Sequence, residues 1–206
     1  MFIKAIIFDY DGVLTNRGAR PQQYAAAAAE LGLSVEELEG RLWDTEPWQL
    51  VKRGQMSDAE FWQRVLPLIG MAPADAPYGP LAFLLQEDLD EDVVGIVRQL
   101  KGRTALALLS NATLAYEPRW VQFELLDLFD VVINSARVGL AKPDREIYEL
   151  ALEKLGCAPG EVLFIDDKAR NTIAAEALGI PSLVFTDAVT LAHELEARGV
   201  LAPKED

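Results

Sequence analysis

The residues best suited to chemistry are carboxylates, a lysine and a hydroxyl, each standing directly after a short apolar run or just before a helix. Four carboxylates crowded into an apolar framework repel one another, which raises their pKa values. Mg²⁺ relieves that repulsion, because it prefers oxygen ligands and commonly takes one or two carboxylates, waters and a substrate phosphate. The candidate residues are Asp9, Asp11, Ser110, Asn111, Lys142, Asp166 and Asp167.

The other members of this group suit an anion. Lys142 supplies a compact positive charge for phosphate or carboxylate. Ser110 offers a hydroxyl, and backbone amides at the start of a helix can bind an anion. Together with a metal they predict an electrostatic cradle for a transferring phosphoryl group. A carboxylate nucleophile that forms an aspartyl-phosphate would complete the set.

Five short apolar runs must position these residues. Runs that are apolar on both faces are typical of parallel strands covered on both sides. Amphipathic helical patterns alternate with them, which predicts an α/β fold with a doubly wound, mostly parallel five-stranded sheet. Ligands bind at the carboxyl ends of such strands, so the polar residues should meet at one sheet edge. The runs are Ile3–Phe8, Ala105–Leu109, Val131–Ile133, Val162–Ile165 and Leu183–Phe185.

One long interval between the first two strands reads as helices. It is Ala-rich near its start, and Ser34 with Glu37 and Ser57 with Glu60 fit capping boxes. We expect a helical cap subdomain at residues 15–88, inserted into a core formed by residues 1–14 and 89–206.

The polar clusters resemble, in order, the four motifs of the haloacid dehalogenase (HAD) superfamily, and the inserted segment resembles its α-helical type-1 cap. Within that superfamily the chain is similar to small sugar-phosphate phosphatases and to the N-terminal phosphatase domain of soluble epoxide hydrolases. The motifs are Asp9-Tyr10-Asp11-Gly12-Val13-Leu14, Ser110-Asn111, Lys142-Pro143 and Phe164-Ile165-Asp166-Asp167.

The resemblance implies a role for each residue. Asp9 would be the nucleophile and a Mg²⁺ ligand. Asp11 would bind Mg²⁺ through its carbonyl, protonate the leaving alkoxide and then activate water. Ser110, the Asn111 amide and Lys142 would hold the phosphoryl group, with Lys142 also bridging to the nucleophile. Asp167 would be a metal ligand, and Asp166 would be a ligand or would orient the metal's waters.

Each cluster alone has a simpler structural explanation. Asp and Gly are common turn residues, Ser and Asn are common helix N-caps, and acids suit the positive end of a helix. These explanations together require several coincidences on one sheet edge.

Other conspicuous residues are expected to have structural roles. His193 and Cys157 lack catalytic partners in the pattern. Trp43 and Trp48 fit either packing or a substrate pocket. Four cations are expected to be solvated, with the alternative that one of them meets the substrate's anion: Arg17, Arg20, Lys52 and Arg53.

Composition limits the remaining choices. The 206 residues are 50% hydrophobic and carry a net charge of −14, which disfavours nucleic acid and anionic membranes as partners. The single cysteine and the absence of a long apolar run or secretory leader predict a soluble, cytoplasmic protein.

The leading hypothesis is a Mg²⁺-dependent phosphatase acting on a small phosphorylated metabolite. A phosphate-ester mutase, a dehalogenase and a catalytically silent binding domain stay as alternatives, and the oligomeric state is open.

Overall fold

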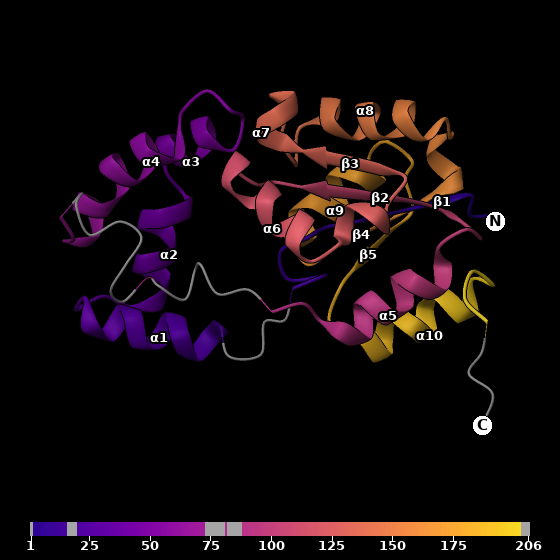
Figure 1. The fold of residues 1–206 in the computed structure, drawn as a ribbon, viewed down its shortest axis with the longest axis horizontal. Helices are drawn as coiled ribbons and strands as arrows, with labels where there is room; N and C mark the ends of the chain where they lie inside the picture. Colours follow the sequence, from indigo (N-terminus) through magenta and orange to yellow (C-terminus); the bar gives the residue numbers. More distant parts are fainter. Residues whose placement is uncertain (1, 16–19, 73–80, 82–87, 203–206) are drawn as a thin grey trace.

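The fold is described from a computed structural model, which covers residues 2–15, 20–72, 81 and 88–202. Its centre is a sheet of five strands in the order β3-β2-β1-β4-β5, with every neighbouring pair parallel. Their carboxyl ends point toward helices α1–α4 (Figure 1). The predicted α/β class and parallel sheet are therefore confirmed. The strands are β1 (Ala5–Phe8), β2 (Ala105–Ser110), β3 (Val131–Asn134), β4 (Val162–Asp166) and β5 (Ser182–Val184).

The sheet is buried because apolar side chains leave both of its faces. Ile6 and Phe8 of β1 belong to the core on one face, while Ala5 and Ile7 belong to the core on the other. Helices α5 and α10 cover the first face and α8 and α9 the second (Figure 1). These helices are α5 (Glu91–Leu100), α8 (Arg145–Leu155), α9 (Ala169–Glu176) and α10 (Ala188–Ala197).

Short elements connect the strands and helices of this layered unit. They are η4 (Leu114–Tyr116), α6 (Glu117–Gln122), η5 (Leu125–Asp127), α7 (Ser135–Val138) and η6 (Pro159–Glu161). None of the helices in the described ranges is long and apolar enough to cross a membrane.

A helical segment, residues 20–69, lies between β1 and α5. The side chains of Ser34 and Ser57 accept the backbone N–H of Glu37 and Glu60, respectively. The side chains of these glutamates accept the backbone N–H of the same serines, so both predicted capping boxes are present. The segment buries an apolar cluster of its own around Leu38, Leu42 and Phe61. Its elements are α1 (Arg20–Glu30), α2 (Val35–Trp43), α3 (Glu46–Val51), α4 (Asp58–Val65) and η1 (Leu66–Ile69).

The chain leaves and re-enters the layered unit at one point. Thr15 and Leu89 form an antiparallel bridge, and the Asp90 N–H donates to the Leu14 carbonyl at 2.9 Å. The expected insertion, residues 15–88, stays a prediction, since residues 16–19, 73–80 and 82–87 lie outside the described part of the chain.

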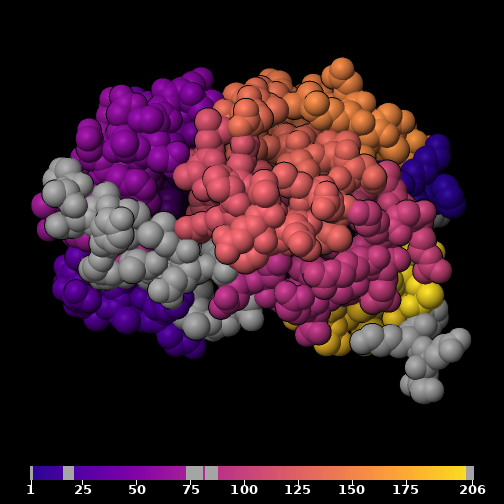
Figure 2. Space-filling view, in the orientation of Figure 1, coloured from indigo at the N-terminus to yellow at the C-terminus, as the bar shows by residue number. Residues whose placement is uncertain are grey.

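The helical segment also touches the layered unit directly, and the space-filling view shows the two as adjoining lobes (Figure 2). Arg53 forms an ion pair with Asp144 at 2.6 Å. Gly54, at φ +67°, packs so closely that a Cβ there would lie 2.2 Å from the Ala136 carbonyl oxygen. These contacts fix the end of α3 beside the carboxyl ends of the strands.

Candidate active site

Asp9 stands immediately after β1, where the strand gives way to a tight turn. Its N–H donates to the Ile165 carbonyl at 2.9 Å, and its Oδ1 accepts the Tyr10 N–H at 2.7 Å. Gly12 adopts φ +81°, a conformation that glycine enters at little cost. The turn brings Asp11 to the same cavity as Asp9.

Lys142 is a buried cation shared by two buried carboxylates. Its Nζ lies 2.8 Å from Asp9 Oδ1 and 2.6 Å from Asp166 Oδ2, and its side chain is only 1% exposed. Such a charge is tolerated in the interior only when it is paired, so Lys142 and the two acids form one electrostatic unit.

Asp166, the last residue of β4, is held more fully than Asp9. Its Oδ1 accepts the Lys168 backbone N–H at 2.8 Å, and the Asn171 side-chain amide lies 2.9 and 3.0 Å from its two oxygens. Both oxygens of Asp166 are therefore engaged. This favours a role in orienting Lys142 and the start of α9.

The unequal hydrogen bonding of Asp9 and Asp166 shifts their pKa values in opposite directions. Burial, and then the charge of Asp166, raise the pKa of Asp9, although Lys142 opposes them. Burial alone would raise the pKa of Asp166, but Lys142 and the hydrogen bonds outweigh it and lower that pKa. Burial likewise acts to lower the pKa of Lys142, and the two carboxylates reverse this and raise it.

Three carboxylates meet closely enough to hold a metal ion. Asp9, Asp166 and Asp167 each offer an oxygen within 4.8 Å of the others, while Lys142 contributes a single positive charge. Oxygen donors at this density fit Mg²⁺. Three of the four predicted metal-ligand residues thus come together, and the fourth, Asp11, lines the adjoining cavity.

The predicted phosphate-binding residues lie at the end of β2. Ser110 is buried, 1% exposed, and lines the cavity with Asn111. The Asn111 side chain binds the backbone of Lys142 reciprocally, donating to its carbonyl and accepting its N–H, both at 2.8 Å. The side chain of Asn111 therefore positions Lys142.

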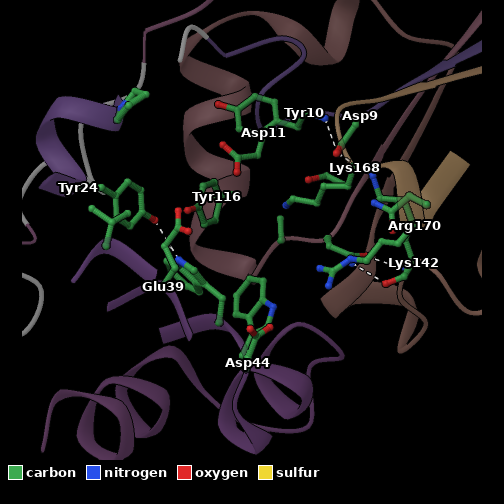
Figure 3. A pocket seen from close by; sticks show the side chains of 18 residues that line it. Asp9, Tyr10, Asp11, Tyr24, Glu39, Asp44, Tyr116, Lys142, Lys168 and Arg170 are labelled. Carbon is green, nitrogen blue, oxygen red and sulfur yellow. Dashed lines mark hydrogen bonds and ion pairs between the residues drawn. The ribbon is translucent and has the colours of Figure 1, made fainter. Parts of the chain in front are cut away.

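These residues open into a cavity of about 570 Å³ between the layered unit and the helical segment. Its two sides differ in chemistry (Figure 3). Asp9, Lys142, Lys168 and Arg170 lie on one side, whereas Tyr24, Glu39 and Asp44 lie on the other. Trp43 and Trp48 also line it, with ring centroids 5.0 Å apart, and both pack against the apolar cluster of the helical segment as well.

Several cavity residues were not anticipated from the sequence. Lys168, Arg170 and Asn171 surround the start of α9, and their position directly after the Asp166-Asp167 pair was an available signal. No local pattern identified Tyr24, Glu39 or Asp44, because α1 and α2 reach the cavity only through tertiary packing.

One expectation was wrong. Lys52 is 4% exposed, whereas a solvated side chain was expected. The close approach of Gly54 to Ala136 carries Lys52, at the end of α3, into the contact between the two lobes. Arg53 pairs with Asp144; Arg17 and the side chain of Arg20 lie outside the described part of the chain.

Similar proteins share this architecture. The chain is 30% identical to the sesquiterpene phosphatase astK of Aspergillus oryzae over 93% of its own length and 94% of that protein. The HAD family enzyme bt-2542 of Bacteroides thetaiotaomicron superposes with a TM-score of 0.71 at 22% identity, covering 95% of this chain and 99% of that one, and has also been solved with magnesium and inorganic phosphate.

A more distant solved structure is L-2-haloacid dehalogenase from Xanthobacter autotrophicus, with a TM-score of 0.66 at 22% identity. The matched region covers 95% of this chain and 83% of the dehalogenase chain, and this likeness concerns the fold. The family model for haloacid dehalogenase-like hydrolases matches residues 3–179. The chain therefore belongs to the haloacid dehalogenase-like hydrolases.

Proposed function

We propose that the protein is a Mg²⁺-dependent phosphatase that hydrolyses a small organic phosphate through an aspartyl-phosphate on Asp9. The observation that carries this proposal is the 2.8 Å contact between Asp9 and the buried Lys142 beside two further carboxylates, with Asp11 lining the same cavity. A nucleophile, a fixed cation, a metal-ligand cluster and a general acid are thereby gathered at one sheet edge.

Asp9 supplies the nucleophilic oxygen. Its bonds to the Tyr10 N–H and to Lys142 both use Oδ1, which assigns the attack on phosphorus to Oδ2. The Oδ2–P bond forms as the bond from phosphorus to the leaving oxygen breaks, and Asp11 gives its proton to that oxygen. Asp11 then takes a proton from the water that hydrolyses the aspartyl-phosphate.

Three other residues hold the phosphoryl group. Ser110 donates its hydroxyl, Asn111 its backbone N–H and Lys142 its charge, while the Asn111 side chain keeps Lys142 in place. Asp9, Asp167 and the Asp11 carbonyl would hold Mg²⁺, with Asp166 as a further ligand or as a support for its waters. Mg²⁺ supplies positive charge that offsets the carboxylates and the phosphoryl oxygens.

The helical segment acts in this proposal as a cap that selects the leaving group. Tyr24, Trp43 and Trp48 present aromatic surface to the cavity, which suits an apolar organic group. The sesquiterpene phosphatase named among the relatives is consistent with that preference.

Hydrolysis of phenyl phosphate tests the proposal. We expect phosphate release with Mg²⁺, loss of release after chelation and recovery when Mg²⁺ is restored. Asp11 indicates a leaving group that needs a proton, and a halide does not need one. We therefore expect no halide release from short 2-haloacids. Phosphate release that persists in metal-free protein, or halide release without phosphatase activity, would contradict it.

A further inference from the structure

Lys52 is a buried charge to which the proposed phosphatase mechanism gives no task. It ends α3 and is 4% exposed, yet its ammonium group takes part in none of the ion pairs or side-chain hydrogen bonds of the described residues. Asp144, an acid that acts on it electrostatically, is already paired with Arg53 at 2.6 Å. Burying an unpaired ammonium is costly, so its position calls for an anionic partner beyond the residues that the structure describes.

The surroundings of Lys52 increase that cost. Burial first, and then the nearby charges of Arg53, Arg170 and Lys168, lower its pKa to about 8, against the weaker effect of Asp144. Such a concentration of cations is unexpected in a chain of net charge −14. A group of cations in a cleft raises the local concentration of anions there.

Two of these cations reach the active-site cavity. Lys168 and Arg170 both line it, and Figure 3 places them on the side of Asp9 and Lys142, away from Glu39 and Asp44. Neither side chain forms an ion pair within the described ranges. Lys168 acts electrostatically on both Asp9 and Lys52.

One phosphoryl group does not account for this cluster. Lys142, Ser110 and the metal ligands already surround the group that Asp9 attacks. We propose that Lys52, Lys168 and Arg170 form a second anion subsite, which binds a further phosphate group on the leaving group of the same substrate. This inference rests on the proposed phosphatase function and specifies its substrate class: organic diphosphates or bisphosphates. The second phosphate is not cleaved in this step and departs on the leaving group.

Three matched substrates test the subsite: phenyl phosphate, phenyl diphosphate and catechol bisphosphate, each with excess Mg²⁺. Hydrolysis of phenyl phosphate tests the phosphatase function by itself. The ratio of kcat/KM for the better doubly phosphorylated substrate to that for phenyl phosphate tests the subsite. We expect a ratio of about ten or more in the wild type, because hydrogen bonds to charged groups of this kind contribute roughly a factor of ten or more in affinity.

Lys52→Met should lower that ratio about tenfold, and Lys154→Met, an exposed lysine on α8, should leave it at the wild-type value. Arg170→Gln, at an exposed position of α9, provides a second variant if Lys52→Met fails to fold. A wild-type ratio near one, or a ratio that neither Lys52→Met nor Arg170→Gln changes, would overturn the proposal.

Binding provides a readout independent of turnover. By calorimetry, ortho-phenylene bisphosphonate should bind the wild type more tightly than phenylphosphonate does, and Lys52→Met should remove the difference. A free anion is the other possible occupant. If sulfate stimulates phenyl phosphate hydrolysis and Lys52→Met abolishes the stimulation, the subsite takes a separate ion and the assignment to the substrate is wrong.

Discussion

Asp9 and Asp166 share one cation, and the difference between them supports the proposal that Asp9 is the reactive acid. Asp166 is stabilised as an anion by Lys142, the Lys168 N–H and Asn171. Asp9 has fewer partners and faces the cavity. A carboxylate that faces the cavity beside a fixed positive charge suits attack on a phosphoryl group.

The role of Asp11 predicts a dependence on the leaving group. Alkoxides need a proton and activated phenolates need it less, so Asp11→Asn should slow alkyl phosphate hydrolysis by about 10²–10⁴-fold and the first turnover of activated aryl phosphates by less. Rapid-quench measurement of the burst separates this first step from dephosphorylation. Equal slowing of the burst for good and poor leaving groups would rule out Asp11 as the general acid.

Lys52 predicts a pH-dependent stability. Its pKa is about 8 in the fold and 10.5 ordinarily, so the unfolded chain binds this proton more tightly. Its contribution is therefore most destabilising below about pH 8 and fades as the pH rises toward 10.5. Thermal unfolding should show Lys52→Met to be more stable than the wild type near neutral pH, with a gain that shrinks at high pH. Lys154→Met serves as the control, and a pH-independent gain would exclude this account.

At the scale of elements, the ends of the strands were predictable and the contacts of the helical segment were not. The apolar runs identified the strands to within two residues at either end, because strands buried on both faces have a strong local signal. Parallel pairing then placed the polar motifs at one edge. The burial of Lys52 and the reach of Tyr24 depend on how two lobes pack, which no local pattern encodes.

The proposed cap function of the helical segment predicts a change in substrate range. Trp48 lines the cavity. Trp62 packs in the same aromatic cluster, with its ring centroid 5.0 Å from that of Phe61, and it is not one of the described residues that line the cavity. Trp48→Ala should therefore alter the relative kcat/KM values of aromatic, alkyl and sugar phosphates. Trp62→Ala should affect stability more than relative rates. An unchanged profile in Trp48→Ala would return Trp48 to a packing role.

The contact between the lobes predicts a different pair of outcomes. Gly54→Ala places a Cβ against the Ala136 carbonyl at a positive φ, so we expect the free energy of unfolding to fall by at least about 1 kcal/mol. Gly40→Ala, inside α2 with no atom within 4 Å of the new Cβ, should raise it by about 0.5–1 kcal/mol. Denaturant unfolding measures both. Equal effects would contradict the close approach at Gly54.

At the scale of the whole molecule, two lobes with opposite properties enclose one cavity. The layered unit contributes the proposed reacting residues and the lining cations Lys142, Lys168 and Arg170, and the helical segment contributes aromatic rings with Glu39 and Asp44. The cavity is mixed in charge, because the cations Lys142, Lys168 and Arg170 lie on one side with Asp9, and the acids Glu39 and Asp44 lie on the other (Figure 3). A phosphorylated ligand should orient with its phosphates toward Lys142, Lys168, Arg170 and Lys52 and its organic part against the aromatic rings of the helical segment.

The central claim is a covalent phosphoryl group on Asp9, and its most direct test is the mass of acid-quenched protein during turnover of an activated aryl phosphate with Mg²⁺. Asp11→Asn should accumulate the intermediate, because it lacks the base that activates water. We predict a phosphoryl adduct on the peptide that contains Asp9, absent from Asp9→Asn and from protein without Mg²⁺. Continued phosphate release by Asp11→Asn with no adduct, or full turnover by Asp9→Asn, would contradict the account.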